Sequence, residues 1–385
     1  MTKLPPRSPK YRDPLTIAAG MQERLLALDI ARGLAALVVV FWHWQHFFFE
    51  NNRISPDFER SRQPFYTALS TIYQQGGHVA VLFFFSLSGF IFYWLYSDAV
   101  KNRRCSAWEF CVLRFARLYP LFFATLVVVG VLQAIHYWKT GSTFVYENND
   151  IRHFVLNLFL VPYWGFENGF SFNGPAWSIS TEVGLYVVFF VLTSLGFQGW
   201  KSLLVFLFTI PVLERSGIDR RWSIPLESFF AGGLACHAIR FYLSSRLKSS
   251  AGNWLVFSSA AAIWLVLVLG EPATFARFDH HRLYARLLFP LTIMALVISD
   301  RPLGRKLVPF RWVGDISYSS YLIHFPLQIL FVLVFVMCGW EREAFYSPTT
   351  LIVFFLVLLP ASYLVFHGFE RPLQNAIRKR LLTAK

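Results

Sequence analysis

Three ionisable side chains lie within apolar stretches of the sequence, where such groups are costly. His43 lies in LDIARGLAALVVVFWHWQHFFF, Glu182 in GPAWSISTEVGLYVV and His324 in WVGDISYSSYLIHFPLQ. Ionisable groups at membrane depth usually face the interior of a helix bundle. An imidazole or a carboxylate held there can move a proton in a reaction. We therefore take His43, Glu182 and His324 as candidate catalytic residues.

The first of these stretches carries a cation at a helical spacing from the imidazole. Arg32 precedes His43 by eleven residues, which is three turns plus about 20° and about 16 Å along a helix axis. Asp29 lies three residues before Arg32 and can pair with it on the same face. One face therefore presents a cation near the helix end and an imidazole deep in the membrane. The alternative is that Arg32 snorkels to the interface and His43 bonds a neighbouring helix.

Two further apolar stretches carry polar residues on one helix face. Ser178, Glu182 and Tyr186 recur at every fourth position. A glutamate that stays hydrated near the interface would give the same pattern. The second seam, at i, i+4, i+7 and i+11, consists of Ser317, Tyr321, His324 and Gln328. This seam either holds helices together through hydrogen bonds or brings its imidazole to a site.

A pair of arginines in CVLRFARLYP lies one helical turn apart. Arg114 and Arg117 stand at the start of an apolar stretch and share a face. Two guanidinium groups on one face suit the recognition of phosphate. Ordinary anchoring of a span by basic residues is the alternative.

Membrane-spanning segments are expected to position these residues. The chain has 385 residues, of which 55% are hydrophobic and only 15% charged, and a mean hydropathy of +0.46, which excludes a soluble globular enzyme and a disordered chain. About ten spans are expected. The charge pattern described in the next paragraph places both termini on one side of the membrane, which requires an even number of spans. The clear ones are 27–49, 76–96, 118–138, 176–198, 224–244, 253–270, 283–299, 312–336 and 350–369. Of the two shorter stretches, we expect 202–214 and not 154–164 to be the tenth.

Basic residues gather at alternate ends of these spans. The chain holds 36 Lys and Arg against 22 Asp and Glu, for a net charge of +14. Most of the cations lie before the first span, within 101–117, 240–248 and 301–311, and after the last span. This asymmetry predicts that both termini are cytoplasmic. The cations form no continuous stripe interleaved with aromatic residues, so we expect no nucleic-acid partner.

The predicted fold is an all-α, polytopic transmembrane helix bundle. We expect a basic cytoplasmic segment at 1–26, the transmembrane domain at 27–370 and a basic cytoplasmic tail at 371–385. The first segment lacks the apolar core and cleavage site of a signal peptide. The four Cys show no CxxC spacing and no His/Cys metal pattern, so no metal is expected. The GxGxxG, P-loop, HExxH and GxSxG motifs are absent from the sequence.

Together these residues resemble the acyltransferase-3 family of integral membrane O-acyltransferases, in the family's order from about Leu25 to about Arg371. One departure is His78-Val-Ala-Val, where many members carry Gly-Val-Asp-Leu, so we assign that segment no catalytic role. The matching elements are Arg32 to His43 (Arg-x10-His), GGHVAVLFFFSLSGF (76–90), Arg114-x-x-Arg117 with Tyr119 and Pro120, NGPAWSISTE (173–182), VGDISYSSYLIHFP (313–326) and FERP (369–372).

The resemblance implies transfer of an acyl group, often acetyl, from cytoplasmic acyl-CoA to a glycan hydroxyl. The acceptor would be a cell-surface or lipid-linked glycan, and the enzyme would lie among the lipids of a bacterial cytoplasmic (inner) membrane. Few residues follow the last span, so the chain looks like the stand-alone type without a further soluble domain. Such enzymes modify exopolysaccharide, O-antigen or lipo-oligosaccharide.

The resemblance also suggests roles for the candidate residues. Arg32, Arg114 and Arg117 would bind the phosphates of acyl-CoA. His43 would act as general base on the acceptor hydroxyl, with an acyl-imidazole on His43 as an alternative. Glu182 would orient His43 or the acceptor hydroxyl. His324 would form part of the acceptor side or lock helices together.

Three more residues are expected to bind substrate: Trp177, Ser178 and Tyr321. Trp177 either stacks on a sugar or lies at the membrane interface. Two other functions fit the same polar cavity. One is a transporter or flippase for a lipid-linked glycan, and the other is an acyltransferase acting on a lipid or protein hydroxyl.

Overall fold

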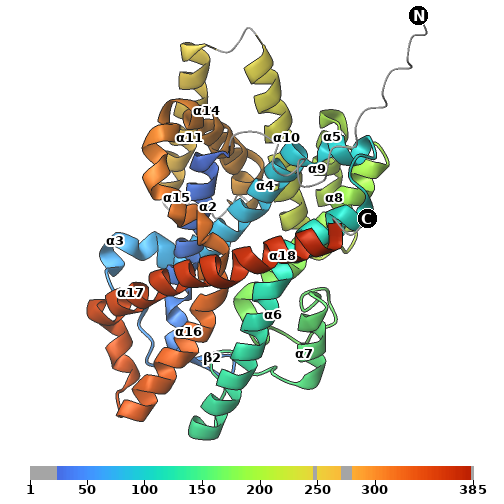
Figure 1. Ribbon diagram of the computed structural model, residues 1–385. Coiled ribbons are helices and arrows are strands. Elements are labelled where there is room, and N and C mark those ends of the chain that lie inside the picture. The colour runs from blue at the N-terminus through green and yellow to red at the C-terminus, as the bar shows by residue number, and fades with distance from the viewer. Residues whose placement is uncertain (1–23, 246–248, 270–279, 383–385) are drawn as a thin grey trace, which may run out of the picture.

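The computed structural model describes residues 24–245, 249–269 and 280–382 and shows an almost entirely helical protein (Figure 1). Within these residues the only sheet is a two-stranded antiparallel one, in which β1 (Phe49–Glu50) pairs with β2 (Arg53–Ile54). The predicted all-α class is confirmed.

The helices are joined by short 3-10 and π turns, labelled η. Those of the first half are α2 (Leu26–Trp42), η1 (His43–Phe48), η2 (Arg60–Arg62), α3 (Tyr66–Thr71), η3 (Ile72–Gly76), α4 (Gly77–Leu95), α5 (Ser97–Lys101), α6 (Ala107–Thr140), α7 (Ile151–Leu158), η4 (Gly174–Ala176) and α8 (Trp177–Ser194). Those of the second half are α9 (Trp200–Arg215), α10 (Arg220–Ser244), α11 (Ser250–Leu269), α13 (His280–Leu283), η5 (Tyr284–Leu288), α14 (Phe289–Leu307), η6 (Val308–Phe310), α15 (Arg311–Asp315), α16 (Ser317–Cys338), η7 (Arg342–Tyr346), α17 (Pro348–Val365), η8 (Phe366–Glu370) and α18 (Arg371–Leu382).

Seven helical stretches within the described residues are long and apolar enough to cross a membrane. Each overlaps a predicted span, so the protein is a multi-pass membrane protein. The stretches are Leu26–Phe48, Tyr66–Leu95, Ala107–Thr140, Gly174–Ser194, His281–Asp300, Pro302–Cys338 and Pro348–Leu382.

Three other predicted spans, 202–214, 224–244 and 253–270, coincide with α9, α10 and α11, which are not among these seven stretches. The sixteen residues of α9 reach about 24 Å, less than the roughly 30 Å of a bilayer core. Charged and small residues lower the mean hydropathy of α10. The predicted span 253–270, which coincides with α11, ends at residue 270, and this residue lies outside the described residues. The eight residues of α7 are too short to cross, in agreement with a non-spanning 154–164. The total of ten spans and the orientation of the termini stay predictions.

Helix α2 lies at the centre of the bundle and packs against α4, α14, α15 and α16. Glycines permit the closest approaches. A Cβ added to Gly33 of α2 would lie 2.1 Å from the Val313 carbonyl oxygen, and one added to Gly89 of α4 would lie 1.9 Å from the Phe229 carbonyl oxygen. Small residues of this kind let helix backbones pack closely within a membrane. The helix that carries Arg32 is thereby held directly against α15, which leads into α16.

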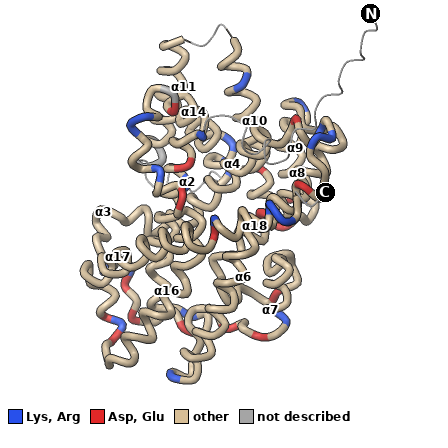
Figure 2. Tube along the Cα trace, viewed as in Figure 1, with Lys and Arg blue, Asp and Glu red and all other residues tan. Residues whose placement is uncertain are grey.

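The predicted basic tail contains a further helix. α18 lies along α6 (Figure 1). Figure 2 shows Lys and Arg gathered around α5, α18 and the C-terminal end. Residues 1–23 of the predicted N-terminal segment and 383–385 of the predicted tail lie outside the described residues.

Candidate active site

The two candidate histidines contact each other in the bundle interior. His43, at the C-terminal end of α2, and His324, in α16, are joined by a hydrogen bond of 2.9 Å between His43 Nδ1 and His324 Nε2. Their rings are nearly parallel, with centroids 5.0 Å apart. Both side chains are buried. The polar seam of α16 therefore joins two helices and also brings a second imidazole to the first.

The outer nitrogens of the pair determine where its protons lie. His324 Nδ1 lies 2.7 Å from the Tyr321 carbonyl oxygen, which can only accept, so neutral His324 carries its proton on Nδ1. His324 Nε2 must then accept the proton of His43 Nδ1. This leaves a lone pair on His43 Nε2, which has no hydrogen-bond partner among the described residues. An imidazole fixed in this tautomer can take a proton at Nε2.

A second group of side chains fixes the end of α2. Gln328 Nε2 donates to the His43 carbonyl oxygen at 2.9 Å, and Gln328 Oε1 lies 3.3 Å from His46 Nδ1. The His46 ring stacks on His43 with centroids 4.4 Å apart, and its Nε2 lies 3.4 Å from the Tyr146 hydroxyl. These contacts hold the catalytic candidate at the point where the α-helix tightens into η1.

A cavity of about 600 Å³ opens around the N-terminal end of α2, and we call it the arginine cavity. Only three carboxylates line it, those of Asp29, Glu109 and Asp315. A concave site with such an excess of guanidinium groups favours a ligand with several negative charges. The eight arginines that line it are Arg24, Arg32, Arg104, Arg114, Arg117, Arg311, Arg371 and Arg378.

Half of these arginines are already paired with carboxylates. Asp29 pairs with Arg24 and Arg32, Asp315 pairs with Arg24 and Arg311, and Glu370 pairs with Arg117. Among the described residues, no carboxylate lies within ion-pair distance of the other four, which are Arg104, Arg114, Arg371 and Arg378. The cavity therefore keeps positive charge that the described part of the chain does not neutralise.

The predicted arginine pair lies in this cavity, but its two members have different surroundings. Arg114 donates to the Tyr96 hydroxyl at 2.5 Å and lies over the Tyr96 ring, while its Nε is buried without a partner. Arg117 is bound to Glu370, which also accepts from Ser319 Oγ at 2.6 Å. Arg114 thus offers a free donor, whereas Arg117 is positioned by a buried carboxylate.

A thiol also lines the arginine cavity. Burial raises the pKa of Cys105 to about 11, and only a thiolate is a strong nucleophile. Cys105 therefore stays protonated near neutral pH and does not compete with His43 for a nucleophilic role.

A smaller cavity of about 170 Å³ adjoins the arginine cavity, and we call it the inner cavity. The two share Arg32, Arg114 and Arg117 in their linings. The predicted stripe of Ser178, Glu182 and Tyr186 lines the inner cavity as well. Glu182 Oε1 accepts from Ser88 Oγ at 2.7 Å, and among the described residues Glu182 does not contact His43.

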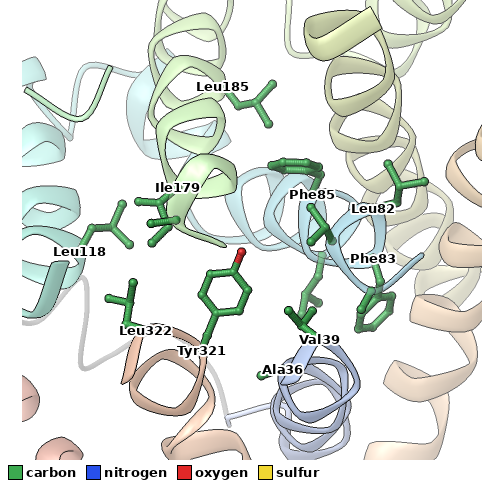
Figure 3. Packing of buried hydrophobic residues seen from close by; sticks show 14 of the residues in the cluster. Ala36, Val39, Leu82, Phe83, Phe85, Leu118, Ile179, Leu185, Tyr321 and Leu322 are labelled. Atoms are coloured by element: carbon green, nitrogen blue, oxygen red, sulfur yellow. The ribbon is translucent and has the colours of Figure 1, made fainter. Parts of the chain in front are cut away.

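Tyr321 connects the inner cavity with the histidine pair. Its hydroxyl bonds Ser178 Oγ at 2.7 Å and donates to the Pro175 carbonyl oxygen at 2.5 Å. Its ring lines the inner cavity and lies 6.1 Å from the His324 ring, centroid to centroid. Figure 3 shows this ring among Ile179 of α8 and Val39 of α2. Tyr321 therefore stands between the inner cavity and the histidine pair, and neither histidine lines either cavity.

The predicted Trp177 lies apart from both cavities. Its ring packs 5.0 Å from Tyr163 and 6.4 Å from Phe85, centroid to centroid. Of the predicted site residues, the structure brings Arg32, Arg114, Arg117, Ser178, Glu182 and Tyr321 to the two adjoining cavities and pairs His43 with His324.

Several residues of this site are not among the sequence-predicted ones: His46, Gln328, Glu370 and five arginines of the arginine cavity, which are Arg24, Arg104, Arg311, Arg371 and Arg378. Gln328 completes the α16 seam described from the sequence, and His46 follows His43 by three residues, a helical spacing that could have identified it. Glu370 stands in FERP, but the sequence does not show that α6 supplies its partner Arg117.

Comparison with protein families gives a match to the acyltransferase domain of the acyltransferase-3 family over residues 25–367. This region contains both histidines and most of the arginine cavity, but it ends before α18.

Several named proteins are similar to the chain. Acyltransferase MdmB of Streptomyces mycarofaciens is 31% identical over 169 residues, which are 43% of this chain and 38% of that protein. An O-acetyl transferase of Shigella phage Sf6 is 23% identical over 66% of this chain and 75% of its own length. Protein 2 in the picA locus of Rhizobium radiobacter is 32% identical over 28% of this chain and 45% of its own length. No solved structure matches the chain.

Proposed function

The chain belongs to the acyltransferase-3 family. We propose that it transfers an acyl group from cytoplasmic acyl-CoA to a hydroxyl of a cell-surface or lipid-linked glycan. The name of the phage relative, an O-acetyl transferase, supports acetyl as that group. The observation that carries this proposal is the arginine cavity, which adjoins an inner cavity lined by Tyr321, a neighbour of the His43–His324 pair. The arginine cavity then lies on the cytoplasmic side of a bacterial inner membrane, where acyl-CoA is found.

The arginine cavity supports an acyl-CoA donor by its charge. Coenzyme A carries a diphosphate and a phosphate monoester, and guanidinium groups bind such oxygens through paired hydrogen bonds. Arg114 and Arg378 each have a buried Nε without a partner. Buried donors without partners are costly, and phosphate oxygens would satisfy them.

The direction of the donor follows from the two cavities. The anionic end fits the arginine cavity, and the uncharged pantetheine arm fits the smaller inner cavity. Arg32 lines both cavities, so it would stand where the phosphates end and the arm begins. The thioester at the end of the arm would then pass Tyr321 to approach His43.

His43 supplies the base for the transfer. The acceptor oxygen attacks the thioester carbonyl carbon while His43 Nε2 takes the hydroxyl proton. The C–S bond then breaks, and the imidazolium returns the proton to the departing thiolate, which gives the ester and free CoA. Throughout, His43 Nδ1 keeps its hydrogen bond to His324 Nε2, so His324 is a positioning residue. An acyl-imidazole formed on Nε2 would use the same residues in two steps.

The acceptor would approach His43 beside His46. The His46 ring stacks on His43, and the Tyr146 hydroxyl lies beside His46. These polar groups, with the orphan Oδ1 of buried Asn173, provide hydrogen-bond partners that suit a sugar.

The test uses purified protein in lipid nanodiscs with radiolabelled acetyl-CoA and candidate glycans. We expect label to appear in an ester on the glycan only when protein, donor and acceptor are all present. If the protein moved a lipid-linked glycan across a liposome membrane without transferring label, the acyltransferase proposal would be wrong and the protein would be a transporter or flippase. Label on lipid or protein hydroxyls in place of glycan would overturn the acceptor class.

A further inference from the structure

One face of α18 lines the arginine cavity. This face consists of Arg371, Gln374, Asn375 and Arg378, at positions i, i+3, i+4 and i+7 of the helix. α18 packs along α6, which supplies Arg114 and Arg117 to the same cavity. The helix follows the residues that match the acyltransferase domain, which end at 367. The cavity wall is therefore completed by a helix that the family match does not cover.

The α18 face brings positive charge that the described residues leave unpaired. No carboxylate of the described residues lies within ion-pair distance of Arg371 or Arg378. The Nε of Arg378 is buried and has no hydrogen-bond partner. A buried guanidinium donor without a partner is costly, which indicates that an anion occupies this part of the cavity when the protein works.

The arginines of the cavity fall into two groups by depth. Arg32, Arg114 and Arg117 also line the inner cavity, whereas Arg24, Arg104, Arg311, Arg371 and Arg378 line only the arginine cavity. An acyl-CoA molecule has two anionic centres, its diphosphate and its 3′-phosphate, and the diphosphate is the nearer to the pantetheine arm. With the arm in the inner cavity, the deep arginines meet the diphosphate and the outer ones meet the 3′-phosphate.

We propose that α18 recognises the 3′-phosphate of the coenzyme, with Arg378 as its direct contact, because the α18 face presents unpaired guanidinium groups at the outer part of the cavity. This inference rests on the proposed function. It assigns α18 the selection of 3′-phosphorylated CoA over donors that lack this group. A phosphate monoester carries up to two charges near neutral pH, so this contact is strong.

The matched control lies on the same helix. Arg380 is two residues from Arg378, about 200° around the helix, and is exposed outside the cavity lining. Replacing either arginine by glutamine removes one charge from α18. Only the replacement at 378 removes a cation that lines the cavity.

The experiment compares acetyl-CoA with 3′-dephospho-acetyl-CoA as donors for the full chain in nanodiscs of neutral lipid. Wild-type protein is expected to show a KM about tenfold or more lower for acetyl-CoA, the size typical of a charge-assisted contact. Arg378→Gln should raise the KM for acetyl-CoA about tenfold, leave that for the dephospho donor within about twofold and leave kcat nearly unchanged. Arg380→Gln should behave as wild type.

The wild-type comparison tests the inference even where a variant fails to fold. Equal wild-type KM values for the two donors would overturn recognition by α18 and leave the proposed acyltransferase intact. Transfer from neither donor would contradict the proposed function itself. If Arg378→Gln raised the KM for both donors equally, the inference would also be overturned and Arg378 would have a structural role. If its effect appeared only with anionic lipid in the nanodisc, Arg378 would bind lipid in place of the coenzyme.

Discussion

Two regions of the molecule are rich in arginine, and they differ in what the arginines face. In the first, which we call the ion cluster, Arg282 and Arg286 meet the fully buried Glu227 at 3.1 and 2.9 Å. Glu214 accepts from Arg282 as well, at 2.5 Å. In the arginine cavity, by contrast, four of the eight arginines have no carboxylate within ion-pair distance among the described residues.

The difference shows that pairing, and not the number of arginines, separates a structural site from a ligand site. The ion cluster ties α9, α10 and the α13–η5 segment together. The arginine cavity holds unpaired donors around an open volume of about 600 Å³. Removing a charge should therefore lower stability in the first region and weaken donor binding in the second.

The largest expected effect comes from breaking the ion cluster. Glu227→Ala leaves two guanidinium groups without their shared carboxylate and should lower the free energy of unfolding by about 3–5 kcal/mol. Thermal or denaturant unfolding in detergent measures this change. The folded fraction of Glu227→Ala should have the wild-type KM for acetyl-CoA. A rise in this KM without a loss of stability would contradict the difference proposed between the two regions.

The next effect belongs to the unpaired arginine of the cavity. Arg114→Ala should raise the KM for acetyl-CoA by about 10- to 100-fold through the loss of a charge-assisted contact. Steady-state kinetics checks this, with the exposed Arg215→Ala on α9 as the matched control. An unchanged KM would make Arg114 a simple anchor of its span.

A smaller effect is expected at Glu370, the buried carboxylate that pairs with Arg117 of the arginine cavity. Glu370→Gln removes the charge that positions Arg117 and should lower the free energy of unfolding by about 1–3 kcal/mol. The same variant should raise the KM for acetyl-CoA, because Arg117 loses its fixed orientation. Wild-type values in both measurements would show that Arg117 does not need its buried partner.

The smallest effect should follow from a paired and exposed arginine. Arg311 faces Asp315 at 3.7 Å and is half exposed, and such pairs contribute about 0–1 kcal/mol. Arg311→Gln should change the KM for acetyl-CoA by less than about threefold. A rise in KM as large as that of Arg114→Ala would show that this exposed arginine binds the donor despite its pairing with Asp315.

Helical spacing in the sequence was enough to predict which residues share a face. The spacing of Arg32 and His43 and the seam through His324 predicted the two sides of the α2–α16 contact, because side-chain directions repeat regularly along a helix. The apolar segments likewise predicted the helices, although α9 is short and α10 carries charged and small residues.

Contacts between helices far apart in the chain could not be predicted in this way. Glu182 was expected to orient His43 or an acceptor hydroxyl. It bonds Ser88 and not His43, because the packing of α8 against α4 sets its neighbours, and its role toward an acceptor stays a prediction. The positions of Glu370 against Arg117 and of α18 against α6 depend on tertiary packing in the same way. A sequence contains residue types and spacings but not the distances between separate helices.

The central claim is that His43 Nε2 is the base of an acyl transfer whose donor is held by the arginine cavity. The most direct test measures two properties of His43→Ala, its transfer from labelled acetyl-CoA and its binding of the donor. The exposed His367→Ala serves as the control variant. The account predicts a fall in kcat of about 10²- to 10⁴-fold, with donor binding and the control unchanged. Normal transfer by folded His43→Ala would contradict it.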